Sequence, residues 1–92
     1  MPYCGTTFQT ISPERVENIL SSLTKACFIG GQAAYQLCDG SYSIDAGEND
    51  IRAYYEEDEE TIKFFCRYER DMRFYDKKLT AFAKTLGIDT KP

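Results

Sequence analysis

The hydrophobic period changes along the chain, and this change constrains the fold more than any other feature. Near the N-terminus, apolar residues recur at the three- and four-residue spacing of an amphipathic helix. Between residues 51 and 68 apolar and polar residues alternate, which is typical of strands with one buried face. After Tyr68 the helical spacing returns and continues to Leu86. The sequence therefore predicts an α+β fold in which strands lie between two helices.

We expect the first helix over residues 13 to 26. Ser12 can cap it, and Pro13 suits the first helical position. Ile11 can pack on Val16 as a hydrophobic staple, which fixes how the chain enters the helix. The apolar stripe of this helix consists of Val16, Ile19, Leu20 and Leu23.

A hairpin should follow, because Asp39-Gly40 is a two-residue turn of the type that favours positive φ. Its strands are predicted near 33–38 and 41–46. A short helix over Gln32 to Cys38 is the alternative, since alanine, glutamine and leucine favour helix. The turn pairs Leu37 with Tyr42 and Tyr35 with Ile44 on one face, and Gln36 with Ser43 on the other.

A second hairpin is predicted from the alternating residues 51–55 and the β-forming residues 61–68, with the acidic residues between them as its loop. A helix over 70–86 follows and ends at Gly87. The alternative is one long helix over 58–86. We prefer the hairpin, which gives the order α-β-β-β-β-α. The expected architecture is an antiparallel meander of about four strands, with both helices on one face, in a single compact domain spanning 1–92.

The composition argues against an enzyme. The chain contains no histidine, which removes Ser-His and Cys-His nucleophile pairs and the usual general base. Its four cysteines lack zinc-site spacing, and Asp45, Asn49 and Glu56 match a calcium loop that Gly47 and Asp50 interrupt. No phosphate-binding loop is present. We therefore expect no catalytic residue, no bound metal and no cofactor.

No signal peptide or membrane span is visible in the sequence, so we expect a soluble, cytoplasmic protein. In that compartment the cysteines at 4, 27, 38 and 66 should be reduced thiols. Three of them lie among apolar residues and are expected in the core. Cys4 is the alternative candidate for a reactive thiol, although no basic neighbour lowers its pKa.

Charge is unevenly distributed along the chain. Residues 45–60 contain eight acids and one arginine, a net charge of −7, whereas the whole protein carries −4. Such a cluster on a hairpin tip either keeps the protein in solution or docks on a basic partner. In the second case neighbouring aromatic residues can anchor the contact. The candidate partner-binding residues are Glu48, Asp50, Tyr54, Tyr55, Glu56, Glu57, Asp58, Glu59 and Glu60.

The open face of the predicted sheet offers a different function. Basic and aromatic side chains interleave there, a pattern that can stack bases and neutralise phosphates of RNA or single-stranded DNA. An ordinary solvated face, with cross-strand pairs such as Glu56 with Lys63, accounts for the same residues. The candidates for this alternative are Arg52, Tyr54, Lys63, Phe65 and Arg67. A third possibility is a small structural subunit of a larger assembly.

The chain resembles the small anti-CRISPR proteins of bacterial viruses in its small size, net acidity, α+β pattern, aromatic residues and lack of catalytic residues. The chain is most similar in style to inhibitors of the type I surveillance complex, which share no common motif. The resemblance implies a viral protein in the host cytoplasm that binds a Cas subunit. As a DNA mimic, its acidic run would oppose a DNA channel, while the basic sheet face could contact guide RNA. No individual residue role is carried over.

Overall fold

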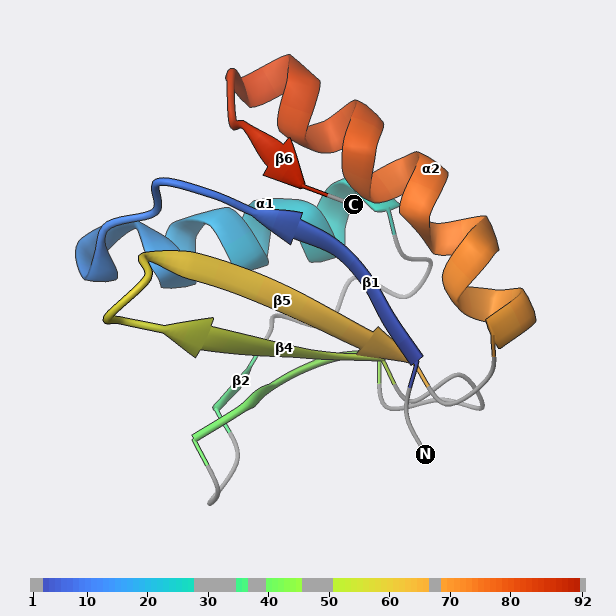
Figure 1. The fold of residues 1–92 in the computed structure, drawn as a ribbon, viewed down its shortest axis with the longest axis horizontal. Coiled ribbons are helices and arrows are strands. Elements are labelled where there is room, and N and C mark those ends of the chain that lie inside the picture. The colour runs from blue at the N-terminus through green and yellow to red at the C-terminus, as the bar shows by residue number, and fades with distance from the viewer. Residues whose placement is uncertain (1–2, 28–34, 37–39, 46–50, 67–68, 92) are drawn as a thin grey trace.

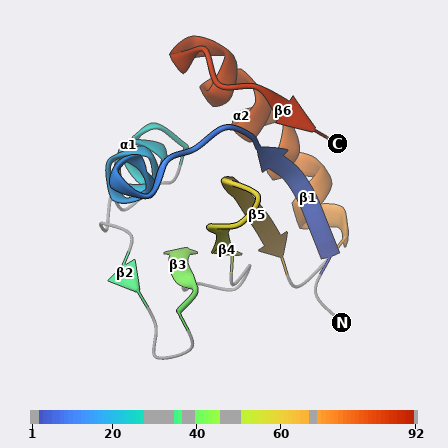
Figure 2. The same cartoon turned by 60° about the vertical axis from the view of Figure 1, so that its left-hand side comes forward.

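A computed structural model describes residues 3–27, 35–36, 40–45, 51–66 and 69–91. In chain order, the elements are β1 (Tyr3–Phe8), the 3-10 helix η1 (Pro13–Arg15), α1 (Val16–Cys27), β2 (Tyr35–Gln36), β3 (Tyr42–Asp45), β4 (Ile51–Glu56), β5 (Thr61–Cys66), α2 (Glu69–Leu86) and β6 (Thr90–Lys91). The strands form one antiparallel sheet in the order β2-β3-β4-β5-β1-β6. Figure 1 shows α1 and α2 on the same side of this sheet, and Figure 2 shows how the sheet curves from β2 to β6.

The α+β class, the antiparallel sheet and the two helices are as predicted, and β2 to β5 are the expected meander. The predicted element order is wrong at both ends. A strand precedes the first helix, and another follows the second helix, so the sheet has six strands within the described residues. β1 lies between β5 and β6, where it forms part of the interior of the sheet rather than its edge.

The first helix begins differently from the prediction. Residues Pro13–Arg15 form the 3-10 turn η1, and the α-helix starts only at Val16. Ser12 occupies the N-cap position, but its side chain makes no capping hydrogen bond. Instead, its backbone carbonyl accepts a hydrogen bond from the Arg15 N–H at 3.0 Å. Tight turns of this kind satisfy backbone groups at a helix start without a side-chain cap.

The first predicted hairpin is present, but its register differs by one residue. Gln36 pairs with Tyr42, and Tyr35 pairs with Ser43. The short helix proposed for this segment is wrong for Tyr35 and Gln36, which form β2; the rest of that segment lies outside the described residues. A one-residue difference in register matters because each residue then shares a face of the sheet with a different neighbour from the one predicted.

The long helix over 58–86 is wrong, and the second hairpin is confirmed. β4 and β5 pair in regular register from Arg52 opposite Phe65 to Glu56 opposite Thr61. Glu60 has φ 54°, in the left-handed region, which no residue inside an α-helix adopts. α2 begins after β5 and is followed by Gly87 with φ 71°. The Ile88 N–H donates to the Ala83 carbonyl at 2.8 Å, as in a glycine-terminated helix.

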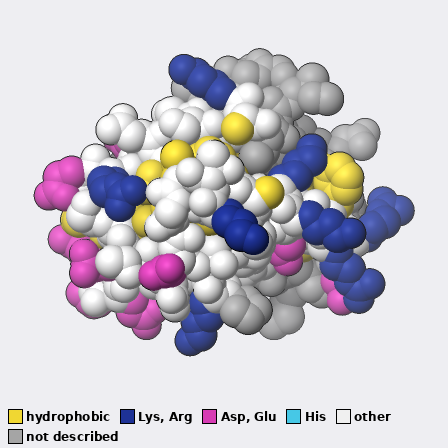
Figure 3. Space-filling model, turned by 90° about the horizontal axis from the view of Figure 1, so that it is seen from above, with side chains coloured by type: hydrophobic (Ala, Val, Ile, Leu, Met, Phe, Trp, Pro, Cys, Tyr) yellow, Lys and Arg dark blue, Asp and Glu magenta, His cyan; other side chains and the backbone are white. Residues whose placement is uncertain are grey.

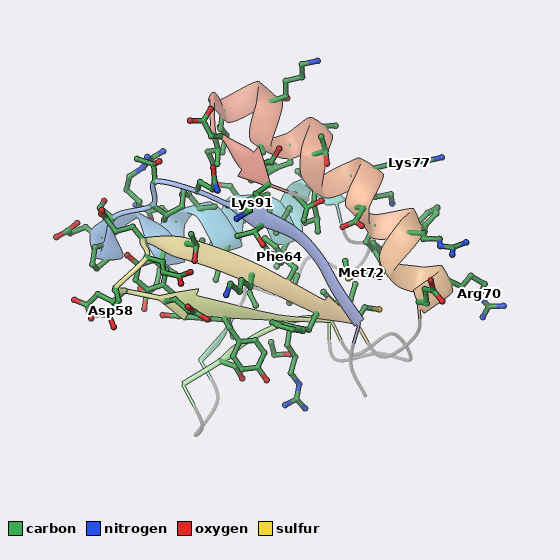
Figure 4. All side chains as sticks on the ribbon, in the orientation of Figure 1. Asp58, Phe64, Arg70, Met72, Lys77 and Lys91 are labelled. Carbon is green, nitrogen blue, oxygen red and sulfur yellow. The ribbon has the colours of Figure 1, made fainter. Side chains whose placement is uncertain are left out.

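One hydrophobic core lies between the helices and the inner face of the sheet. Phe8 of β1 and Phe64 of β5 are fully buried and meet edge to face, with ring centroids 4.8 Å apart. Figure 4 labels Phe64 at this central position. The stripe predicted for the first helix supplies the opposite wall through Val16, Ile19, Leu20 and Leu23. In α2 the buried residues are Met72 and Leu79, which lie at the predicted helical spacing, and Ala83, which was not predicted. Among the described residues, no helix has the length and apolarity needed to cross a membrane.

A bulge in β1 fits closely against α2. The register of β1 against β5 shifts between Cys4 and Thr7. There the Thr6 N–H donates to Asp76 Oδ1 at 2.8 Å, and the Thr6 hydroxyl donates to the same oxygen at 3.0 Å. Gly5 allows this approach because it lacks a side chain at the contact. The Asp76 carboxylate thus replaces a hydrogen bond that the bulge removes from the strand ladder.

Candidate functional site: the acidic hairpin tip

The acidic run forms the tip of the β4–β5 hairpin. Glu56 ends β4, the turn follows, and Thr61 begins β5. All five acidic residues from Glu56 to Glu60 are exposed. Figure 4 labels Asp58, which points away from the body of the molecule. The structure therefore presents the predicted run as one continuous, outward-facing group of carboxylates, called the acidic tip below.

The acidic tip is held by the segment that connects β1 to η1. The buried Ile11 donates its backbone N–H to the Glu60 carbonyl at 2.8 Å, and its own carbonyl accepts a hydrogen bond from the Tyr55 hydroxyl at 2.6 Å. Thr10, immediately before Ile11, has φ 60°, and Glu60 also lies in the left-handed region. Non-glycine residues enter that region at a cost of about 1–3 kcal/mol each. The surrounding hydrogen bonds and packing therefore fix the shape of the turn.

The two tyrosines beside the acidic tip point to opposite faces of the sheet, because neighbouring strand residues alternate. Tyr55 packs against the core and is half-buried. Its burial raises the pKa of its hydroxyl, and the charges of Glu60, Glu57 and Glu14 raise it further. Tyr54 lies on the outer face and is exposed. Of the two predicted aromatic anchors, Tyr55 is therefore already bonded within the fold, and Tyr54 remains accessible.

The charge of the acidic tip is partly balanced on one side. Lys63 Nζ lies 3.1 Å from Glu56 Oε1 and 3.8 Å from Glu59 Oε2. Lys63 is directly opposite Tyr54, so the predicted Glu56–Lys63 pair exists as a diagonal contact. The side chains of Glu57, Asp58 and Glu60 make no ion pair within the described parts of the chain. These three carboxylates carry the unpaired charge of the tip.

Glu14 extends the acidic surface, and sequence analysis did not include it. It lies in η1, far from the run in sequence, yet its charge acts on Tyr55 together with those of Glu57 and Glu60. Figure 3 shows most acidic side chains of the viewed face at one end, with a group of lysine and arginine side chains at the other end and further ones between. The contact between the segment before η1 and the acidic tip cannot be predicted from local sequence patterns. It is made by hydrogen bonds between Ile11 and residues far away in the chain.

The outer sheet face brings together most of the residues proposed for nucleic-acid binding. Tyr54 and Phe65 meet edge to face, with centroids 5.0 Å apart and rings at 88°. Arg52 lies opposite Phe65, and both are half-buried, as is Lys63. Arg67 lies outside the described residues, as do Glu48 and Asp50 of the proposed partner-binding set.

The described residues contain no group of three or more acidic or cysteine side chains arranged to hold a metal ion. Cys66 is a buried free thiol. Cys38 lies outside the described residues, and so does the part of the calcium-like segment over residues 46–50, which includes Gly47, Asn49 and Asp50.

The fold and tip define an α+β protein with a curved antiparallel sheet, two helices on its inner face and an exposed acidic hairpin tip. Comparison with protein-family models, with curated proteins and with solved structures gave no match to this chain.

Proposed function

We propose that this chain is a non-enzymatic binding module whose acidic tip docks on the basic groove of a nucleic-acid-handling partner and blocks nucleic acid from entering it. The observation that carries the proposal is the fixed geometry of the tip. Ile11 holds the Glu60 backbone at 2.8 Å, while Glu57, Asp58 and Glu60 project unpaired charges from it. A loop that serves only solubility needs charge but no defined shape. A mimic of phosphates needs both, because complementary charges must meet a fixed surface.

The resemblance to anti-CRISPR proteins suggests the first partner to test, a type I CRISPR–Cas surveillance complex in the cytoplasm of a bacterial host. Such a complex handles DNA in a basic channel, which acidic side chains can occupy in place of the DNA backbone. On this proposal the chain binds without turnover, and target DNA and the protein compete for one site.

The experiment begins with capture of partners from a host lysate, identification by mass spectrometry and purification of the partner. The test variant combines Glu57→Gln, Asp58→Asn and Glu60→Gln, which keeps side-chain size and removes the unpaired charges. The matched control combines Glu17→Gln, Glu69→Gln and Asp89→Asn, exposed acids outside the tip. We expect the tip variant to associate at least about tenfold more slowly at low salt, with weaker salt dependence, because charge complementarity governs association rates.

The control variant should retain the parental association rate, and the tip variant should keep the parental melting temperature. Target-DNA binding by the partner should recover with the tip variant and stay blocked with the control. Equal association rates and salt slopes for the parent and the tip variant would show that the tip does not dock.

A further inference from the structure

The solvent-facing side of α2 carries a second, chemically different surface. Arg70, Phe74, Lys77 and Ala81 follow one another at spacings of four, three and four residues, which places them on one side of the helix. All four are exposed, whereas Met72, Leu79 and Ala83 of the same helix are buried. Three further cations, Arg73, Lys78 and Lys84, flank this line. We call the outward line and these flanking cations the α2 stripe.

Phe74 is the unusual member of the α2 stripe. Its side chain is 58% exposed, more than that of any other large hydrophobic residue among the described residues. Lys78 Nζ lies 4.8 Å from the centroid of its ring, and the Tyr75 ring meets it edge to face at 5.1 Å. Tyr75 packs against the core, so Phe74 is braced by a residue that is itself held. An exposed aromatic ring supported in this way and surrounded by cations is typical of a recognition surface.

Most cations of the α2 stripe reach solvent. Figure 4 shows Arg70 and Lys77 directed away from the molecule. Arg73 Nη2 bonds Glu69 Oε1 at 2.9 Å, but the two side chains are 78% and 57% exposed. Exposed ion pairs of this kind contribute little free energy, so Arg73 can leave Glu69 for a phosphate. The outer sheet face differs, because its Lys63 is held by two carboxylates of the acidic tip. Exposed positive charge therefore lies on α2 beside Phe74, whose ring is more exposed than that of Tyr54 on the sheet.

We propose that the α2 stripe binds single-stranded nucleic acid, with a base stacking on Phe74 and with phosphates bound by Arg70, Lys77 and neighbouring cations. Stacking uses the flat face that every base offers, and the lysine and arginine side chains neutralise the backbone. A membrane surface fits less well, because α2 exposes Phe74 and Leu86 as large apolar side chains among many charged ones, whereas membrane-bound helices present a broad apolar face. This proposal does not depend on the acidic tip or its partner.

The acidic tip does not prevent this binding. Asp58 and Arg70 lie at opposite ends of the molecule in Figure 4, and the molecule is 30 Å long. Salt at 0.1 M screens charge beyond about 10 Å. The stripe itself spans about 21 Å from Arg70 to Lys84 at the usual helical rise, enough to follow several nucleotides of an extended strand.

The test measures fluorescence anisotropy of labelled oligonucleotides of about twelve nucleotides in about 50 mM salt. One probe is single-stranded RNA of mixed sequence, one is the matching DNA, and one is an abasic strand that keeps the phosphates. We expect the RNA and DNA to bind more tightly than the abasic strand. Phe74→Ala should weaken binding of the strands with bases at least about fivefold and leave the abasic strand nearly unchanged.

Lys77→Ala should weaken all three probes and reduce the slope of log K against log salt by about 0.7, as expected for the loss of one phosphate contact on a single strand. Arg15→Ala, which removes one exposed charge from η1, is the matched control and should leave binding unchanged. Because Lys77 is exposed, Lys77→Ala should leave the melting temperature unchanged, and Phe74→Ala should remain folded, since it loses only the ring contacts with Tyr75 and Lys78.

Three outcomes would overturn the proposal. One is no binding of RNA or DNA at 50 mM salt. Another is binding that Phe74→Ala and Lys77→Ala both leave intact, which would place the contact elsewhere. The third is displacement of the bound RNA by polyglutamate or by phosphatidylserine vesicles at matched charge concentration, which would make the stripe a general anion surface.

Discussion

Gly5→Ala tests the packing of α2 on the β1 bulge. Gly5 has no positive φ, so its backbone accepts an alanine without strain. The obstacle is space, because an added Cβ would meet Asp76 Oδ1 and lie 2.5 Å from Met72 Cε and 2.8 Å from Met72 Sδ. Met72 can rotate, at the expense of its buried position in the core. Asp76 can move only by giving up its hydrogen bonds to Thr6.

The expected cost follows from these two adjustments. Overpacking of a filled site typically costs about 1–3 kcal/mol, and leaving the buried Thr6 N–H without its acceptor costs about 1–3 kcal/mol. Relaxation will avoid part of each, so we expect Gly5→Ala to lower the free energy of unfolding by about 2–4 kcal/mol. For a domain of this size, that corresponds to a melting temperature lower by about 10–25 °C. Urea denaturation followed by circular dichroism measures the change directly.

Gly87→Ala is the matched control, because it has the opposite character. Gly87 has φ 71° and nothing within 4 Å of an added Cβ, so its substitution costs backbone strain alone, about 1–2 kcal/mol. Gly5→Ala should therefore be the more destabilising of two identical chemical changes. A Gly5→Ala protein within about 0.5 kcal/mol of the parent, the range of neutral surface changes, would refute close packing of α2 on the bulge.

Two further substitutions test the core and the support of the acidic tip. Phe64→Ala removes a fully buried ring that contacts Phe8, and we expect a loss of about 3–5 kcal/mol in urea denaturation; a loss below about 1 kcal/mol would contradict the central position of Phe64. Tyr55→Phe removes the hydrogen bond to the Ile11 carbonyl and should lower the melting temperature at pH 7, whereas an unchanged value would mean that this bond does not hold the tip. Since the pKa of Tyr55 is raised above its ordinary value of 10.0, the folded state keeps the phenolic proton longer than the unfolded chain does. The stability from this shift is complete below pH 10 and is lost as the pH rises through the raised pKa, so the parent should lose stability above about pH 10 more steeply than Tyr55→Phe.

Much of the fold follows from local sequence patterns. The stripe that includes Met72 and Leu79 predicts α2, because apolar residues sustained at helical spacing over many residues are typical of an amphipathic helix. Alternation along β4 and β5, with a charged segment between them, predicts their hairpin and its buried faces. These features depend on residues close together in the chain.

The missing strands depend on distant residues. β1 contains tyrosine, threonine and phenylalanine, which favour strands, but Gly5 and adjacent polar residues break the alternation. The break in alternation corresponds to the bulge, which the hydrogen bond from Thr6 to the distant Asp76 stabilises. β6 is two residues long and carries no periodic signal of its own. The register of β2 against β3 likewise depends on pairing that the Asp39-Gly40 pattern did not predict correctly.

The candidate site, like the fold, could be predicted from the sequence only in part. The charge of the acidic tip is visible in the sequence, and its exposure follows from the hairpin. The connection through Ile11 is not visible in the sequence, because the Ile11 backbone bonds the Tyr55 hydroxyl and the Glu60 carbonyl, both far away in the chain. For the same reason Glu14 could not be assigned to the acidic surface from its own neighbours in the chain.

The position of β1 between β5 and β6 sets the order in which this protein can fold. Phe8 pairs with Ile62 on one side and with Thr90 on the other, so β1, which is synthesised before the other described strands, is among the last of them to complete its pairing. The β4–β5 hairpin can form early from neighbouring residues, but closing the sheet requires contacts across most of the chain. Such distant pairing slows folding. During synthesis, the Tyr3–Phe8 segment lacks its β5 partner until residues 61–66 have left the ribosome, and it lacks its β6 partner until the residues beyond α2 have followed.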